Sequence, residues 1–323
     1  MNRYFKDIFL LLVYFPYRWL VQLLPFQISY QIATLLGNIH YCFLLPRQKR
    51  QFVTNIELVF GNKLNPREKK VILRRFYINQ QKRLVDLFIL GRKDYTKYLQ
   101  ACSSEGLNYI DQVIYKGKGL VGVNFHFGSV NLIAPYVIYK GYKITPLLVL
   151  TSYIKEASPW VSEQVMNIKS SIWKERGNFQ IITSSNSLVC VVRNQYRCLS
   201  RNQIISAAGD GALGGKFAVV DFFNIKLKAS IGPAYMSAKS GAAIVPSFAI
   251  RRKDNAHHFV FKEPIKIESE DAETLKRVIQ EYIKHLEYYI SQHPDHWRYW
   301  TRIEVEEFKN GILVIRLLPG IGE

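Results

Sequence analysis

The sequence predicts an α/β fold, in which a mixed, mostly parallel sheet is covered by helices. The first indication is the alternation of short apolar runs with longer amphipathic segments after Gly119, because strands separated by helical patterns are typical of parallel sheets. The second is the run Leu120 to Phe125, whose small and apolar residues suit a strand buried on both faces. The third is the length of 323 residues, enough for one large domain with a sizeable core.

Residues 1–26 are expected to form a membrane-associated helix. Ile8 to Phe15 and Leu20 to Leu24 are apolar, but Pro16 and Arg18 interrupt them. A transmembrane helix needs about 20 apolar residues in a row, so an interfacial helix is favoured. A single span with Arg18 reaching back to the surface is the alternative. A cleaved signal peptide is disfavoured, because no small-residue cleavage site follows.

Residues 27–302 are expected to form one domain that begins with helices. Gln27 to Leu45 reads as an apolar helix, and Pro66 opens a long amphipathic helix that runs to about Leu90. Between them lies a basic cluster that either binds anionic lipid headgroups or is simply solvated. Its members are Arg47, Lys49 and Arg50.

Five further strands are predicted after the first one. They are Ile144 to Leu148, Gln180 to Thr183, Gln203 to Ala207, Ala218 to Phe222 and Ala243 to Ile250. Residues 303–323 are expected to be a C-terminal extension, in which the apolar run Ile312 to Leu318 forms an extra strand or an apolar tail.

The composition favours a membrane over a nucleic acid as the partner. Lysine and arginine number 44 against 25 acidic residues, and 14% of the residues are aromatic. Such a chain suits either partner, but it has an apolar N-terminus and no recognisable nucleic-acid motif. Its four cysteines show no metal-ligand spacing, which predicts reduced thiols in a protein facing the cytoplasm, without a metal site.

His126 is the first candidate for chemistry. It follows the predicted strand Leu120 to Phe125 and precedes a glycine-containing turn, a combination that no other histidine of the chain has. Open α/β sheets place their chemistry at the carboxyl ends of strands. The turn Gly209-Asp210-Gly211 and Arg251 also follow predicted strands, so we expect them near the same edge. The other histidines are expected to be structural.

Several segments resemble one known family. Phe125-His126-Phe127-Gly128, followed by a helix, resembles the His-x4-acid box of the lipid A biosynthesis acyltransferases, a family of lauroyl and myristoyl transferases. The resemblance extends from the N-terminal helix to about Arg302. Three later segments carry it further: Ser230 to Arg251, Glu263-Pro264, and His293 to Trp300.

This resemblance implies a glycerolipid acyltransferase-like fold, related to that of lysophospholipid acyltransferases. It also implies a membrane-associated O-acyltransferase on the cytoplasmic face of the inner membrane. Such an enzyme moves a fatty acyl group from acyl carrier protein or coenzyme A to a hydroxyl of a glycolipid or lysolipid, and it needs no cofactor. The sequence does not disclose the acceptor, the chain length or the donor.

Asn131 departs from the family pattern, which has an acid five residues after the histidine. A carboxylate stabilises the imidazolium that forms when His126 takes a proton, whereas an amide can only orient the ring. Asp210 or Asp221 could supply the missing carboxylate, and the sequence does not decide between them. The alternatives are a catalytically impaired lipid-binding homologue and a thioesterase or lipid hydrolase on the same scaffold.

Acyl transfer also needs donors for the oxyanion and positive charge for a phosphorylated substrate. The backbone amides of Phe127 and Gly128 are the candidate oxyanion donors. The resemblance makes Arg251 the strongest candidate for binding a headgroup or the phosphopantetheine of the donor. Arg252, Lys216 and Lys169 are further candidates, although exposed basic residues are common.

Overall fold

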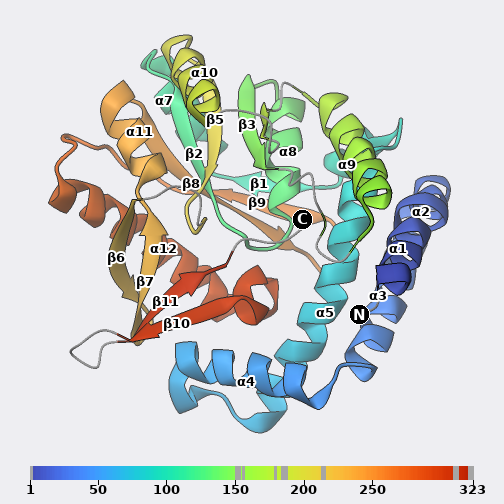
Figure 1. The fold of residues 1–323 in the computed structure, drawn as a ribbon. Coiled ribbons are helices and arrows are strands. Elements are labelled where there is room, and N and C mark those ends of the chain that lie inside the picture. The colour runs from blue at the N-terminus through green and yellow to red at the C-terminus, as the bar shows by residue number, and fades with distance from the viewer. Residues whose placement is uncertain are drawn as a thin grey trace.

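The computed structural model describes residues 3–149, 154, 157–177, 180–182, 188–211, 216–307 and 313–318. Within them the chain forms a seven-stranded sheet, in the order β1-β9-β8-β2-β5-β3-β4, and a smaller four-stranded sheet (Figure 1). The strands of the larger sheet are β1 Ser103–Glu105, β2 Leu120–Asn124, β3 Ile144–Val149, β4 Gln180–Ile182, β5 Ile204–Ala208, β8 Ala243–Arg251 and β9 His257–Phe261. All their pairings are parallel except that of β8 with β9. The predicted α/β fold is confirmed.

The helices are α1 Arg3–Leu12, α2 Arg18–Leu23, α3 Phe26–Cys42, α4 Pro46–Phe60, α5 Pro66–Leu90, α6 Tyr95–Gln100, α7 Leu107–Tyr115, α8 Ile133–Tyr139, α9 Pro159–Lys174, α10 Leu188–Ser200, α11 Gly232–Ser240 and α12 Ala272–Gln292. A π-helical turn, Val13–Tyr17, joins α1 to α2 around Pro16. Proline has no amide hydrogen for an α-helical bond, and here the backbone widens locally instead of ending the helix. No helix of the described residues is both long and apolar enough to cross a bilayer.

The alternation of side chains along β2 explains why an apolar core lies on each face of the main sheet. Val121, Val123 and Phe125 lie in one apolar core, together with residues of α11 and α12. Leu120 lies in the other core, together with residues of α7 and α8. Successive side chains of a strand point to opposite faces, so one apolar run fills both cores and the strand is completely buried.

The smaller sheet has the order β10-β11-β7-β6 among the described residues. Its strands are β6 Phe217–Phe222, β7 Ile225–Ser230, β10 Ile303–Glu307 and β11 Leu313–Leu317. Ala218 to Phe222 was expected in the main sheet and lies here instead. The reason is the two-residue turn after Phe222, where Phe223 has a φ of +52° and the chain folds back as an antiparallel hairpin. The described part of the C-terminal extension completes this sheet.

Candidate active site

His126 and Asp210 meet at the carboxyl edge of the main sheet. β2 and β5 are parallel neighbours, with Asn124 opposite Ala208, so the residues that follow both strands leave the sheet side by side. His126 Nδ1 lies 2.8 Å from Asp210 Oδ1, and the backbone N–H of His126 donates to Asp210 Oδ2 at 2.9 Å. The carboxylate therefore holds both the backbone and the ring of the histidine.

Burial differs between the two partners. The Asp210 side chain is completely buried, whereas 29% of the His126 side chain is exposed. The contact with Asp210 assigns the ring proton to Nδ1, which leaves Nε2 with a free electron pair. No hydrogen bond occupies Nε2 in the described part of the chain. This nitrogen can therefore accept a proton from a bound molecule, and the ion formed is stabilised by a buried negative charge.

Tyr299 is a third member of the site. Its hydroxyl lies 3.1 Å from His126 Nδ1, and the two rings meet edge to face at 4.9 Å between centroids. Burial raises the pKa of Tyr299, and the charge of Asp210 raises it further, so the phenol stays neutral. The residue before Tyr299 also contacts the histidine, because the backbone N–H of Arg298 donates to the backbone carbonyl of His126 at 2.9 Å.

The structure brings only one of the two candidate carboxylates to His126. Asp221 lies on β6 of the smaller sheet, where it is exposed and paired with Lys226. Asn131 lies in a short 3₁₀ helix, Val130–Leu132, and its side chain makes no hydrogen bond with His126 among the described residues. The carboxylate that contacts His126 thus comes from the turn after β5 rather than from the position of Asn131.

The amides of Phe127 and Gly128 already have partners. The Phe127 N–H donates to the Phe125 carbonyl at 2.6 Å, and the Gly128 N–H donates to the His296 carbonyl at 2.9 Å. Gly128 has a φ of +54°, and an added Cβ would lie 1.9 Å from the Ala249 carbonyl oxygen of β8. This turn is built for close packing, and the geometry does not favour the predicted oxyanion role of the two amides.

Arg251 is buried in an ion pair instead of facing open space. The N–H groups of its Nη1 and Nη2 donate to the two carboxylate oxygens of Asp86 on α5, and Nη2 also donates to Ser129 Oγ at 3.0 Å. Burial opposes the charge, but Asp86 outweighs it and raises the pKa of Arg251 above its ordinary value. Substrate binding by Arg251 stays a prediction. The geometry does not favour it, because the guanidinium is already hydrogen-bonded to Asp86 and Ser129.

The other predicted cations are scattered. Arg252 is exposed and paired with Asp254, and Lys216 is exposed just before β6. Lys169 is buried on α9, with its ammonium 5.6 Å from the ring centroid of Tyr14. Burial and, to a smaller extent, the charge of Arg298 together lower the pKa of Lys169 to about 8. No contact among the described residues joins any of these three to His126, and their binding roles stay predictions.

The buried network around Asp86 ties the helices to the turn after His126. Tyr30 of α3 donates to Asp86 Oδ1 at 2.6 Å, and the Ser129 hydroxyl donates to Asp86 Oδ2. Tyr98 of α6 continues the network, because its hydroxyl lies 3.0 Å from that of Tyr30 and 2.7 Å from His257 Nδ1. Sequence reasoning missed this network, since Asp86 falls in an amphipathic helix pattern with nothing to mark it.

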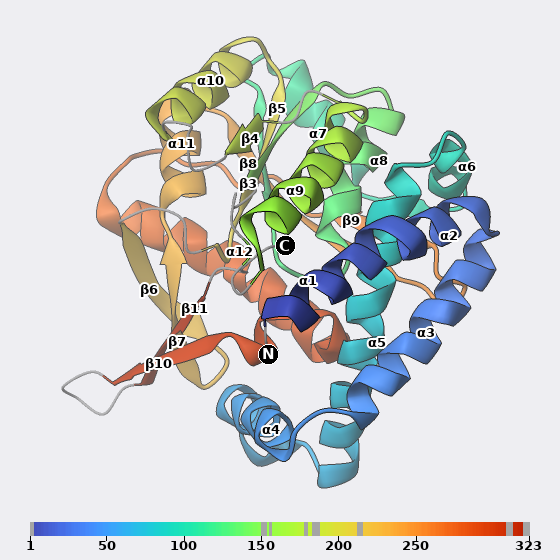
Figure 2. The ribbon, with the colours of Figure 1, turned by 45° about the vertical axis from the view of Figure 1, so that its right-hand side comes forward.

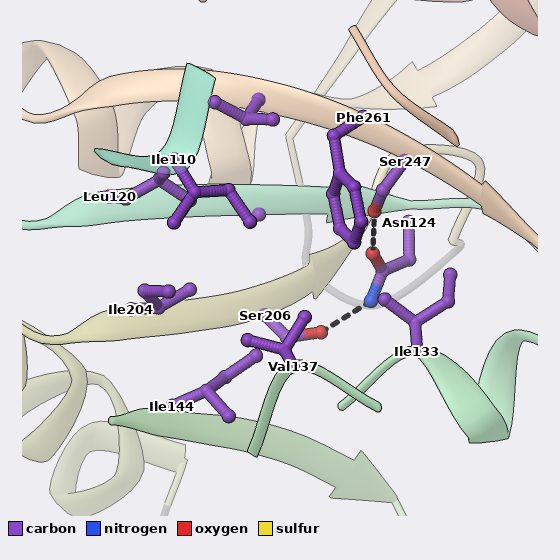
Figure 3. A pocket seen from close by; sticks show the side chains of 12 residues that line it. Ile110, Leu120, Asn124, Ile133, Val137, Ile144, Ile204, Ser206, Ser247 and Phe261 are labelled. Atoms are coloured by element: carbon purple, nitrogen blue, oxygen red, sulfur yellow. Dashed lines mark hydrogen bonds between the residues drawn. The ribbon is translucent and has the colours of Figure 1, made fainter. Parts of the chain in front are cut away.

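A small cavity lies behind the site, on the face of the sheet that α7 and α8 cover (Figure 3). Its volume is about 20 Å³, enough for a water molecule and much too small for a fatty acyl chain. Asn124, two residues before His126, donates to Ser206 Oγ at 2.5 Å and accepts from Ser247. These bonds join the three central strands β8, β2 and β5 just below the catalytic edge.

An imidazole backed by a buried carboxylate, at the carboxyl edge of a mostly parallel sheet, is an arrangement that α/β enzymes use for general-base catalysis. The particular kind follows from the sequence comparison. Residues 3–302 match the family model of the bacterial lipid A biosynthesis acyltransferases, and the chain belongs to this family. The resemblance seen in its motifs is thereby confirmed, and the protein is an acyltransferase. A comparison with curated proteins gives no match.

Proposed function

We propose that the protein transfers a fatty acyl group from acyl carrier protein or coenzyme A to a hydroxyl of a lipid A precursor or a related glycolipid, with His126 as the general base. The observation that carries this proposal is the contact between His126 Nδ1 and the buried Asp210. That contact leaves Nε2 free to take a proton, and family membership supplies the reaction class.

In the proposed reaction, Nε2 of His126 removes the proton of the acceptor hydroxyl while its oxygen attacks the thioester carbonyl. The tetrahedral intermediate then collapses, the carbon–sulfur bond breaks, and the imidazolium returns the proton to the leaving thiolate. Asp210 stabilises the imidazolium and keeps the ring in the reactive tautomer. Tyr299, whose hydroxyl lies beside Nδ1, restricts the rotation of the ring.

The same contact supports an active enzyme despite Asn131. The family's acid is replaced by an amide, but a carboxylate from the β5 turn occupies the place behind the ring. An impaired, purely lipid-binding homologue is therefore the weaker explanation.

Association with a membrane surface is part of the proposal. α1 and α2 lie against α9 and α5 along one side of the molecule (Figure 2). Leu10, Tyr14 and Val21 point into the core, while the opposite side of these helices exposes apolar side chains. The exposed ones include Phe5, Phe9, Leu12, Trp19 and Leu23. Such a one-sided apolar face suits a helix lying in the cytoplasmic surface of the inner membrane.

The deciding experiment compares the wild type with His126→Ala. Purified protein, an acyl thioester and a lipid extract as acceptor are incubated, and the products are identified by mass spectrometry. We expect an acylated lipid from the wild type and from the control His285→Ala, whose histidine lies on α12, and none from His126→Ala. Full activity of His126→Ala would refute the assignment of the base. Release of free fatty acid without an acceptor would instead favour a thioesterase.

A further inference from the structure

A second hollow, larger than the cavity behind His126, lies between α4 and α5. This groove has a volume of about 570 Å³. Lys49, Val53 and Glu57 line it from α4, where a spacing of four residues puts them on one helix face; Lys69, Lys70 and Leu73 line it from α5. In both ribbon views α4 lies at the lower end of the molecule, apart from β2 and β5 (Figures 1 and 2).

The groove carries excess positive charge. The Lys69 ammonium donates to Glu57 Oε1 at 2.5 Å, so the only carboxylate among the lining residues is taken by one of the three lysines. Lys49 lies 5.1 Å from the ring centroid of Tyr41, and neither Lys49 nor Lys70 has an ion pair among the described residues. The ammonium groups of Lys49 and Lys70 are therefore available to bind an anion.

The surrounding sequence strengthens this charge. Residues 46–75 contain nine lysines and arginines and two glutamates, a net charge of +7 within a chain of +19. Glu68, the second glutamate, accepts the Asn65 N–H in the cap of α5 and so is committed to the helix end. The region attracts anions from a distance, and the groove offers a place to hold one.

The neighbouring turn is apolar and exposed. Phe43 and Leu45, between α3 and α4, have 82% and 63% of their surface exposed. The floor of the groove is also partly apolar, through Val53 and Leu73. Positive charge beside an exposed aromatic side chain matches the boundary of a bilayer, where phosphate groups lie next to the ends of the acyl chains.

We propose that the α4–α5 groove binds the phosphate-bearing headgroup of an anionic phospholipid, while Phe43 and Leu45 enter the outer acyl layer. This site is separate from the His126 site and needs no acyl transfer. It would fix the tilt of the protein on the membrane together with the exposed side of α1 and α2.

The test measures vesicle binding by co-sedimentation. Lys49→Gln with Lys70→Gln removes two charges from the groove, and Lys276→Gln with Lys284→Gln removes two from exposed positions on α12. A lysine at an anionic membrane surface is worth about 1 kcal/mol, so the groove variant should bind vesicles of phosphatidylcholine with phosphatidylglycerol roughly 10- to 30-fold more weakly. The α12 variant should bind these vesicles like the wild type. On vesicles of phosphatidylcholine alone, the wild type and the two double variants should bind equally.

Equal losses in both double variants would mean that net charge alone drives binding, and no loss in the groove variant would mean that the site is wrong. Either result overturns the proposal. His126→Ala should bind vesicles as the wild type does, which separates this inference from the proposed reaction. Circular dichroism of each variant confirms folding; Lys69 is left unchanged because it is buried and paired with Glu57.

Discussion

The ring of His126 is held by groups that are far away in the sequence. Asp210 is 84 residues away and Tyr299 is 173 residues away. The sequence left Asp210 and Asp221 open because the choice depends on which strand lies next to β2, and that is a property of the whole sheet. Tyr299 was not predicted because nothing in the segment His293 to Trp300 indicates that it packs against the histidine.

Asp210→Asn should lower kcat by about three to four orders of magnitude, the size of the effect seen when an amide replaces the acid behind a serine-protease histidine. The amide keeps the shape of the side chain but cannot stabilise the imidazolium. The matched control is Asp221→Asn, which changes a carboxylate that does not contact His126. Initial rates of acyl transfer for the two variants provide the measurement, and equal rates would remove Asp210 from the mechanism.

Asn131→Asp restores the acid of the family pattern. Since Asp210 already lies behind the ring, we expect kcat to change by less than about tenfold. A gain of several orders of magnitude would show instead that the site of the wild type is impaired. The same initial-rate assay distinguishes the two results.

At the scale of elements, the strands were predictable and their partners were not. The six predicted strands are all present, because apolar runs bounded by polar turns mark strands well. The hairpin partner β7 was missed, although its apolar residues alternate with lysines as in a half-buried strand. Arg251 was expected to bind a substrate because the family resemblance pointed to it, but its guanidinium pairs with Asp86, 165 residues away, inside the core.

The turn between β2 and α8 allows a test of packing. Gly128→Ala should lower the free energy of unfolding by more than about 2 kcal/mol, because the new methyl group would collide with the Ala249 carbonyl. Gly117→Ala is the control, since Gly117 also has a positive φ but has no atom within 4 Å of an added Cβ. It should cost only the backbone term of about 1 kcal/mol. Urea unfolding provides the comparison, and equal losses would refute the close contact.

At the scale of the whole molecule, buried histidines make the fold sensitive to acid. Burial and, to a smaller extent, the nearby charge of Arg251 together lower the pKa of His257 from 6.5 to about 3. Between these two values the unfolded chain binds a proton that the folded chain does not. Stability is therefore complete above pH 6.5 and falls as the pH drops toward 3.

His257→Gln should flatten this dependence. The wild type should lose about 3 kcal/mol of stability through His257 between neutral pH and pH 4, and the variant should lose less. His258→Gln, at a partly exposed position on the same strand, should keep the slope of the wild type. The measurement is the urea midpoint as a function of pH. An unchanged slope in His257→Gln would mean that the ring titrates normally in the folded protein.

The packing of Trp297 and Arg298 against the turn that follows β2 has a consequence during protein synthesis. The carbonyl of His126 is bound by Arg298, and the antiparallel bridge between Phe127 and Trp297 joins the same two stretches. A nascent chain that stops before these positions contains His126 and Asp210 but lacks the backbone contacts that hold the turn of His126 in place. We therefore expect translation products that end before Trp297 to be inactive. The chain must be synthesised almost to the end of the domain before it can acylate a lipid.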